Sequence, residues 1–137
     1  MQYSDSEFPW IKILTFGFDR GIPETAIGCL LIDLRGIDFD DPAKDDALKG
    51  LTGKATDVAQ HVLASPMAFT SLDLICGQAT ALLDYTASKF LTVNILIGDR
   101  DGQTRAVVVG DAVAEILNAR GIPTEVEHRH LESDAPQ

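Results

Sequence analysis

The stretch from residue 97 to residue 106, "IGDRDGQTRA", gathers side chains that can do chemistry into one short loop. An apolar run ends just before this loop, and a segment with helical apolar spacing begins just after it. The loop holds Asp99, Arg100, Asp101, Gly102 and Arg105. Three interpretations follow from these residue types: an anion-binding turn, a carboxylate-based catalytic site, or a charged turn on the surface.

The anion-binding interpretation rests on the order strand, turn, helix. The first backbone N–H groups of a helix have no partners inside the helix and lie at the positive end of its dipole. Gly102 permits a tight turn and the close approach of a ligand. Arg105 can place two guanidinium N–H groups on one phosphate. We therefore expect Arg105 and the backbone N–H groups of this loop to hold a phosphate.

The catalytic interpretation rests on the order Asp99, Arg100, Asp101, Gly102 directly after a strand. This D-x-D-G pattern resembles the first motif of haloacid-dehalogenase-type phosphohydrolases, in which an aspartate accepts the phosphoryl group beside Mg²⁺. The later acidic motif of that family has its own strand, whereas "AVVVGD" (106–111) lies inside the helical spacing that begins at the loop. We therefore expect a non-catalytic protein, with an aspartate-based, Mg²⁺-dependent phosphohydrolase as an alternative.

Other short motifs do not predict a metal or a cofactor. "GLTGKAT" (50–56) lacks the spacing of a P-loop, and the acidic cluster "DFDDPAKDD" (38–46) lacks the order of a calcium-binding loop. "HRHL" (128–131) offers two histidines on one face of a strand, but no third ligand is indicated.

Hydrophobic periodicity predicts the elements that position the loop. Apolar runs predict strands over 10–18, 28–36, 91–98 and 124–131, the second of them buried. Apolar residues at i, i+3, i+4 and i+7 predict helices from Thr56 to the break at Pro66, over 67–90, and from the loop to Gly121. Residues 36–54 are rich in Asp, Gly and Pro and predict a long surface loop, which is expected to cover the site.

A strand, a loop, a helix and a strand over 91–128 form a βαβ-like unit, which predicts an α/β fold with helices packed on a small mixed or mainly parallel sheet. Ligands bind at the carboxyl ends of strands in such sheets, and the 97–106 loop lies at such an end. We expect one ligand-binding domain over 9–131, a flexible N-terminus over 1–8 and a flexible tail over 132–137.

Composition limits the partners. The 137 residues include 11 basic and 21 acidic side chains, for a net charge of −10, which disfavours RNA because nucleic-acid binding depends on neutralising phosphates. No apolar run approaches the roughly 20 residues that span a bilayer. No secretory signal is visible at the N-terminus, so a cytoplasmic protein is expected. Cys29 and Cys76 lie in apolar runs and are expected to be buried free thiols.

Five stretches resemble one family, in order and approximate spacing. "FGFDRGIP" (16–23), "IDLRG" (32–36), "LTG" (51–53), "IGDRDGQTRAV" (97–107) and "HRHL" (128–131) are similar to FGFKYGIP, FDVR, LTG, IGCTGGQHRSV and HRDL in the C-terminal domain of the bacterial RNase adapter protein RapZ family. The resemblance covers residues 11–131.

The resemblance implies an α/β domain that binds a phosphorylated metabolite, glucosamine-6-phosphate, and small regulatory RNA, and that forms homo-oligomers. The larger proteins of the family carry an N-terminal kinase-like ATPase domain, and this chain would be a standalone version of the C-terminal module. Asp99 stands where the family has a cysteine, so a thiolate nucleophile is absent. His130 replaces the aspartate of HRDL.

The expected function is therefore a non-catalytic binding domain for a sugar phosphate or a nucleotide, which senses or sequesters its ligand, with an RNA-binding adapter as an alternative. We expect Arg35 and Arg129 to approach the loop from neighbouring strand ends. The predicted ligand-binding residues are Asp99, Arg100, Asp101, Gly102, Gln103, Thr104, Arg105, Arg35, Arg129 and His128.

Overall fold

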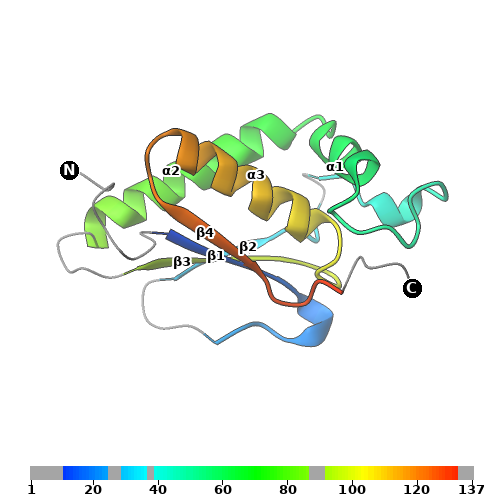
Figure 1. Ribbon diagram of the computed structural model, residues 1–137, viewed down its shortest axis with the longest axis horizontal. Helices are drawn as coiled ribbons and strands as arrows, with labels where there is room; N and C mark the ends of the chain where they lie inside the picture. Colours follow the sequence, from blue (N-terminus) through cyan, green and yellow to red (C-terminus); the bar gives the residue numbers. More distant parts are fainter. Residues whose placement is uncertain (1–10, 25–28, 37–38, 87–91, 133–137) are drawn as a thin grey trace.

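The described part of the chain forms four strands and three α-helices (Figure 1). The computed structural model describes residues 11–24, 29–36, 39–86 and 92–132. The N-terminus and tail that the sequence predicts to be flexible lie outside these residues, apart from Glu132. The elements in chain order are β1 (Ile11–Gly17), the 3-10 turn η1 (Phe18–Arg20), β2 (Cys29–Asp33), the 3-10 turn η2 (Pro42–Lys44), α1 (Thr56–Leu63), α2 (Ala68–Thr86), β3 (Val93–Asp99), α3 (Arg105–Ala119) and β4 (Thr124–His128).

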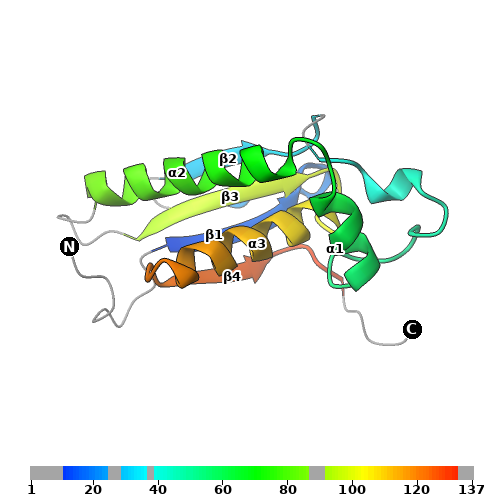
Figure 2. The same cartoon turned by 90° about the horizontal axis from the view of Figure 1, so that it is seen from above.

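The strands form one parallel sheet in the order β2-β3-β1-β4. The predicted α/β fold is thus confirmed, with a wholly parallel sheet among the described strands. Figure 1 shows the α-helices on the same side of this sheet, and Figure 2 shows α2 along the β2 and β3 side and α3 along the β1 and β4 side. The helix-facing side chains of the two central strands are fully buried: Ile11, Ile13, Val93, Ile95 and Ile97.

The predicted helices are present, because each has an apolar stripe that the sheet can bury. None of the helices in the described ranges is long and apolar enough to cross a membrane.

The prediction of a buried strand over 28–36 is wrong. β2 (Cys29–Asp33) lies at the edge of the sheet, pairs with β3 alone, and alternates between exposed and half-buried residues. Cys29 is accordingly an exposed free thiol, whereas Cys76 is buried as expected. An apolar run does not show whether a strand is central or at an edge, because both kinds of strand can have the same apolar residues in sequence.

Residues 39–54 do more than cover the surface. Phe39 and Leu48 are buried in the main core, so this segment is anchored in the core rather than projecting into solvent. At its far end the Gly53 N–H donates to the Gln103 carbonyl oxygen at 2.7 Å. The segment therefore has a fixed position over the loop that follows β3.

The order of the strands decides where a site can form. From β1 the chain crosses β3 to reach β2, and from β3 it crosses β1, through α3, to reach β4. The two adjacent central strands thus lead away in opposite directions, which opens a crevice at their carboxyl ends. Gly17 and Asp99 are aligned there, one at the end of each strand.

Candidate functional site

The buried side chain of Asp99 holds the loop after β3 by hydrogen bonds to its backbone. Its carboxylate is 1% exposed and accepts hydrogen bonds from the Gly102 N–H at 2.5 Å and the Ala106 N–H at 3.0 Å. Gly102 has a φ of 81°, which the tight turn requires and which favours glycine. Because Ala106 is the second residue of α3, Asp99 also caps that helix.

The environment of Asp99 changes how the loop can bind an anion. Burial raises the pKa of the Asp99 carboxyl, although the N–H groups of Ala106 and Gly102 act in the opposite direction. These two N–H groups already have a carboxylate as their acceptor. The expectation that backbone N–H groups of the loop hold phosphate therefore fails for Gly102 and Ala106, because the chain provides its own anion.

Arg105 is the buried cation of the site. It is 4% exposed, and its Nη2 lies 3.7 Å from Oδ2 of Asp41. Its Nε has no hydrogen-bond partner in the described structure. A buried charged donor without a hydrogen bond costs roughly 1–3 kcal/mol or more, so an acceptor that binds this group would stabilise the protein. Two cavities lie against this side chain.

The first cavity has a volume of about 240 Å³ and lies between the loop and residues 41–52. Its polar uncharged lining is Thr52, Gln103 and Thr104. Its charged lining is mostly acidic: Asp41, Asp99, Asp101 and Glu132 against Arg100 and Arg105.

The second cavity has a volume of about 420 Å³ and is also lined by the Asp41–Arg105 pair. It shares Asp41, Arg100 and Arg105 with the first cavity. Its other charged or titratable lining residues are Arg35, Asp40, Lys44, Asp45 and His61. Arg35 is held by Asp33, at 3.0 Å from Nε and 2.8 Å from Nη2, and stacks 3.7 Å above the Phe18 ring.

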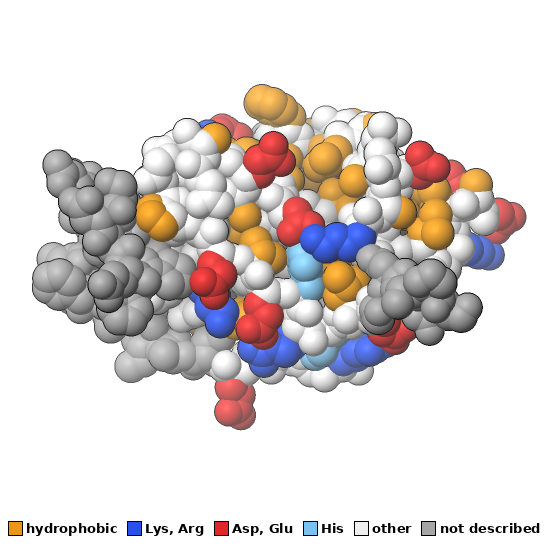
Figure 3. Space-filling model, in the orientation of Figure 1, with side chains coloured by type: hydrophobic (Ala, Val, Ile, Leu, Met, Phe, Trp, Pro, Cys, Tyr) orange, Lys and Arg blue, Asp and Glu red, His pale blue; other side chains and the backbone are white. Residues whose placement is uncertain are grey.

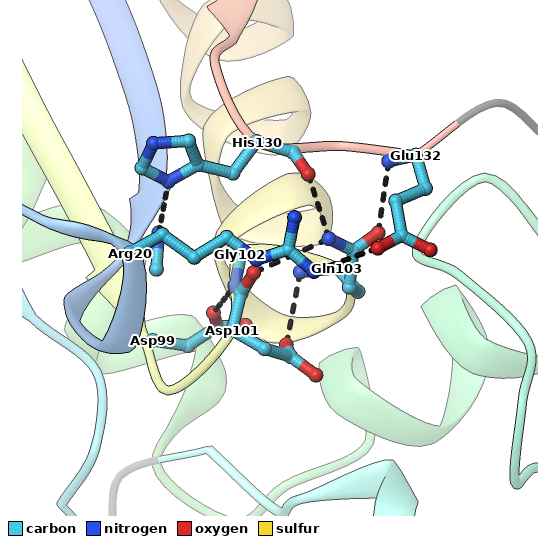
Figure 4. Close-up of polar contacts among 8 residues, drawn as sticks. Arg20, Asp99, Asp101, Gly102, Gln103, His130 and Glu132 are labelled. Atoms are coloured by element: carbon cyan, nitrogen blue, oxygen red, sulfur yellow. Dashed lines mark hydrogen bonds and ion pairs between the residues drawn. The ribbon is translucent and has the colours of Figure 1, made fainter.

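The segment after β4 fixes Gln103, as Figure 4 shows. The Gln103 side-chain amide donates to the His130 carbonyl oxygen at 2.7 Å and accepts from the Glu132 N–H at 3.0 Å. The Glu132 carboxylate pairs with Arg20 at 2.7 Å. Gln103 therefore uses its amide to dock this segment on the loop.

His130 completes this docking. Its Nδ1 accepts the Gly17 N–H at 2.9 Å, which requires an unprotonated nitrogen. Burial, with Arg20 and Arg129 nearby, lowers the pKa of His130 and favours that neutral form. β4 ends at His128, so the prediction that His128 and His130 share one strand face is wrong.

His128 belongs to a separate hydrogen-bond network. Its Nδ1 lies 2.7 Å from the Thr15 hydroxyl, and its Nε2 lies 2.9 Å from Asp111, which pairs with Lys54 at 2.9 Å. Burial opposes ionisation of Asp111, but the hydrogen bonds from His128 and Lys54 outweigh it and lower its pKa. This hydroxyl–imidazole–carboxylate series links β1, β4 and α3, and its three residues do not line the two cavities described above.

The predicted site residues thus separate into two groups. Those that line at least one of the two cavities are Asp99, Arg100, Asp101, Gln103, Thr104, Arg105 and Arg35. Gly102 shapes the turn, His128 lies in its own network, and Arg129 pairs with Glu127 at 2.5 Å; none of these three lines either cavity.

Sequence reasoning did not find the residues that residues 39–54 and α1 contribute: Asp41, Lys44, Thr52 and His61. Thr52 lies in the family-like stretch "LTG" (51–53), but no motif marks the other three. The length of the 36–54 loop was the one indication of their involvement, and it does not identify individual residues.

Comparisons with known proteins cover nearly the same span as the fold. Residues 9–132 match the family model described as the RapZ C-terminal domain. A "Nucleotide-binding protein" of Sphingopyxis alaskensis is 37% identical over 98% of this chain and 41% of its own length. Proteins with the same description from Bifidobacterium adolescentis and Rubrobacter xylanophilus are 34% and 32% identical, over 89% and 90% of this chain and 38% and 41% of their own lengths. The chain thus spans about two fifths of these relatives.

Proposed function

The chain belongs to the RapZ C-terminal domain family, and from this premise we propose that it binds a phosphorylated small molecule at the carboxyl ends of β1 and β3. The ligand is a sugar phosphate or a nucleotide, and the protein senses or sequesters it without transforming it. The relatives' description as nucleotide-binding proteins supports this class, although the chain spans only part of their length.

One observation carries the proposal: Arg105 is buried, lines both cavities, and its Nε lacks an acceptor in the described structure. Asp41 lies 3.7 Å from Nη2, too far for a hydrogen bond, so the attraction from this carboxylate is only partial. A phosphate oxygen has the charge and the lone pairs that this guanidinium lacks. Arg105 is therefore the principal anion-binding group.

Binding without catalysis agrees with the position of Asp99. A phosphoryl acceptor presents a free carboxylate oxygen to its substrate. Each Asp99 oxygen instead accepts a backbone N–H, one from Gly102 and one from Ala106. Attack by Asp99 would break the cap of α3 and the turn of the loop together.

A sensing role is supported by residues 39–54. This segment contributes Asp41 to the ion pair with Arg105 and is hydrogen-bonded to the loop through Gly53. A phosphate that binds Arg105 competes with Asp41, so binding weakens the ion pair that joins this segment to Arg105. The proposal also includes self-association, which the family resemblance implies. Native mass spectrometry at micromolar concentration is expected to show a homo-oligomer, and a monomer would contradict this part of the proposal.

Isothermal titration with a panel of sugar phosphates and nucleotides tests the binding proposal. Loss of a charge-assisted hydrogen bond costs about 1.5–3 kcal/mol, so Arg105→Ala is expected to weaken binding about 10- to 100-fold. Arg120→Ala is the matched control, because Arg120 is exposed and pairs with Asp73 at 3.9 Å, away from both cavities. Absence of any binding, or equal binding by Arg105→Ala, would refute the proposal. Mass spectrometry of small molecules that co-purify with the protein identifies the ligand.

A further inference from the structure

We propose that the second cavity is a second anion subsite, so that the ligand carries two phosphoryl groups. This inference rests on the proposed function, because it places the second group beside the one that Arg105 binds. The two phosphoryl groups are either at separate positions of one sugar or adjacent, as in a diphosphate.

The ion pairs of the chain single out this cavity. Of the 11 basic residues, Lys89 lies outside the described structure, and eight of the other ten form ion pairs with carboxylates. On the face in Figure 3, acidic and basic side chains lie next to one another. The two described cations without a carboxylate partner are Lys44 and Arg100, and both line the second cavity. In a chain with 21 acidic residues, two cations without a carboxylate partner lie in the wall of the same cavity. An anion that enters this cavity can therefore pair with both.

The balance of charge separates the two cavities. Among the described lining residues, the first has four carboxylates and two guanidiniums, so it is less favourable than the second cavity for an additional phosphoryl group. Among the residues that the structure describes, the second has three carboxylates and four cations: Arg35, Lys44, Arg100 and Arg105. His61 lies in the same wall and provides imidazole nitrogens as further hydrogen-bonding groups. Positive charge therefore exceeds negative charge in the second cavity, although the chain as a whole has a net charge of −10.

The wall that presents Lys44 is built into the fold. The Asp40 N–H donates to the Ser65 hydroxyl at 2.7 Å, and this hydroxyl donates to the Val62 carbonyl oxygen, also at 2.7 Å. The Asp41 carboxylate accepts the Ala43 N–H at 3.0 Å and so caps the η2 turn that ends at Lys44. The second cavity thus has a supported wall, and Lys44 extends from it as an exposed, adaptable cation.

Arg105 links the two subsites. It lines both cavities, it is the buried cation of each, and its Nε has no acceptor. A ligand with one phosphoryl group in each cavity satisfies this guanidinium and brings the second group to Lys44 and Arg100. A ligand with one phosphoryl group leaves Lys44 and Arg100 without a partner.

The test compares matched ligands by isothermal titration at constant ionic strength and without divalent cations. Fructose 1,6-bisphosphate against fructose 6-phosphate tests separated phosphoryl groups, and ADP against AMP tests adjacent ones. In at least one pair the second phosphoryl group is expected to tighten binding about tenfold or more, since it gains charge-assisted hydrogen bonds from two cations. The pair that shows the gain identifies the arrangement.

Two variants assign the gain to the second cavity. Lys44→Ala is expected to reduce the bisphosphate advantage about threefold, and the double variant Lys44→Ala with Arg100→Ala is expected to abolish it. Lys49→Ala is the control, because Lys49 pairs with Asp46 and does not line the second cavity. Equal affinity for the two members of both pairs, or an equal loss for both members in Lys44→Ala, would overturn the second subsite and leave the proposed function standing. Failure of every phosphorylated ligand to bind would overturn both.

Discussion

Removal of the Asp99 carboxylate is expected to destabilise the protein strongly. In Asp99→Ala the N–H groups of Gly102 and Ala106, which now donate to this carboxylate at 2.5 Å and 3.0 Å, lose a buried acceptor. A lost helix cap costs about 1 kcal/mol, and each buried donor without a partner costs roughly 1–3 kcal/mol. The release of a partly unfavourable buried charge offsets some of this cost. We expect a net loss of about 2–4 kcal/mol.

Urea denaturation followed by circular dichroism at pH 7 measures this loss. Asp46→Ala is the control, because the Asp46 side chain is 92% exposed and pairs only with Lys49, so its removal is expected to cost less than about 0.5 kcal/mol. A loss below about 1 kcal/mol in Asp99→Ala would contradict the assignment of this carboxylate as the internal anion of the loop.

The pH dependence gives a second, independent test of the same residue. Burial raises the pKa of Asp99, so the folded protein holds this proton to a higher pH than the unfolded chain does. The part of the stability that is linked to the Asp99 proton is therefore full below the ordinary pKa and is lost as the pH rises through the raised value, whereas the two hydrogen bonds to the carboxylate remain. The amide that Asp99→Asn introduces does not titrate, so the stability of the wild type minus that of this variant is expected to fall across this window and to be constant above it. A difference that increases with pH would refute the reasoning.

Three further predictions concern other parts of the molecule. Gly110→Ala is expected to lower the free energy of unfolding by about 1–3 kcal/mol in thermal denaturation, because a Cβ there would lie 2.5 Å from Cγ2 of Thr15. Gly77→Ala, in the open middle of α2, is expected to raise it by about 0.5–1 kcal/mol. Equal effects of the two substitutions would contradict this packing. The pKa of His130 is lowered, so its contribution to stability is expected to be full above the ordinary pKa and to be lost as the pH falls through the lowered value, where the Gly17 N–H loses its acceptor. Urea denaturation at several pH values checks this prediction, because His130→Gln is expected to lack the loss of stability at low pH. A gel-shift assay with structured small RNA is expected to give no complex even at low salt, and a salt-sensitive complex there would reinstate the RNA-adapter alternative.

Hydrophobic periodicity was sufficient for the elements of this protein. The strands at 11–17 and 93–99 and the helix at 105–119 follow from local apolar spacing, because burial of one face repeats along the chain with the period of each element. The turn at Gly102 and the anion-binding potential of Arg105 also follow from a short stretch, since seven consecutive residues, 99–105, form the loop. The resemblance to the RapZ C-terminal domain rests on such local stretches as well, and the family match confirms it.

Tertiary structure decided the rest, because it concerns residues that are distant in the sequence. Asp41 and Lys44 reach Arg105 only through the path of residues 39–54, which Phe39 and Leu48 anchor in the core. No local pattern shows that β2 would be an edge strand or that Arg129 would pair with Glu127 away from the cavities. In the loop itself the sequence determined which groups are present. The tertiary structure decided that the Asp99 carboxylate accepts two backbone N–H groups of its own loop and that the Nε of Arg105 lacks an acceptor in the described structure. Both depend on the whole fold, because burial and pairing involve residues from several elements.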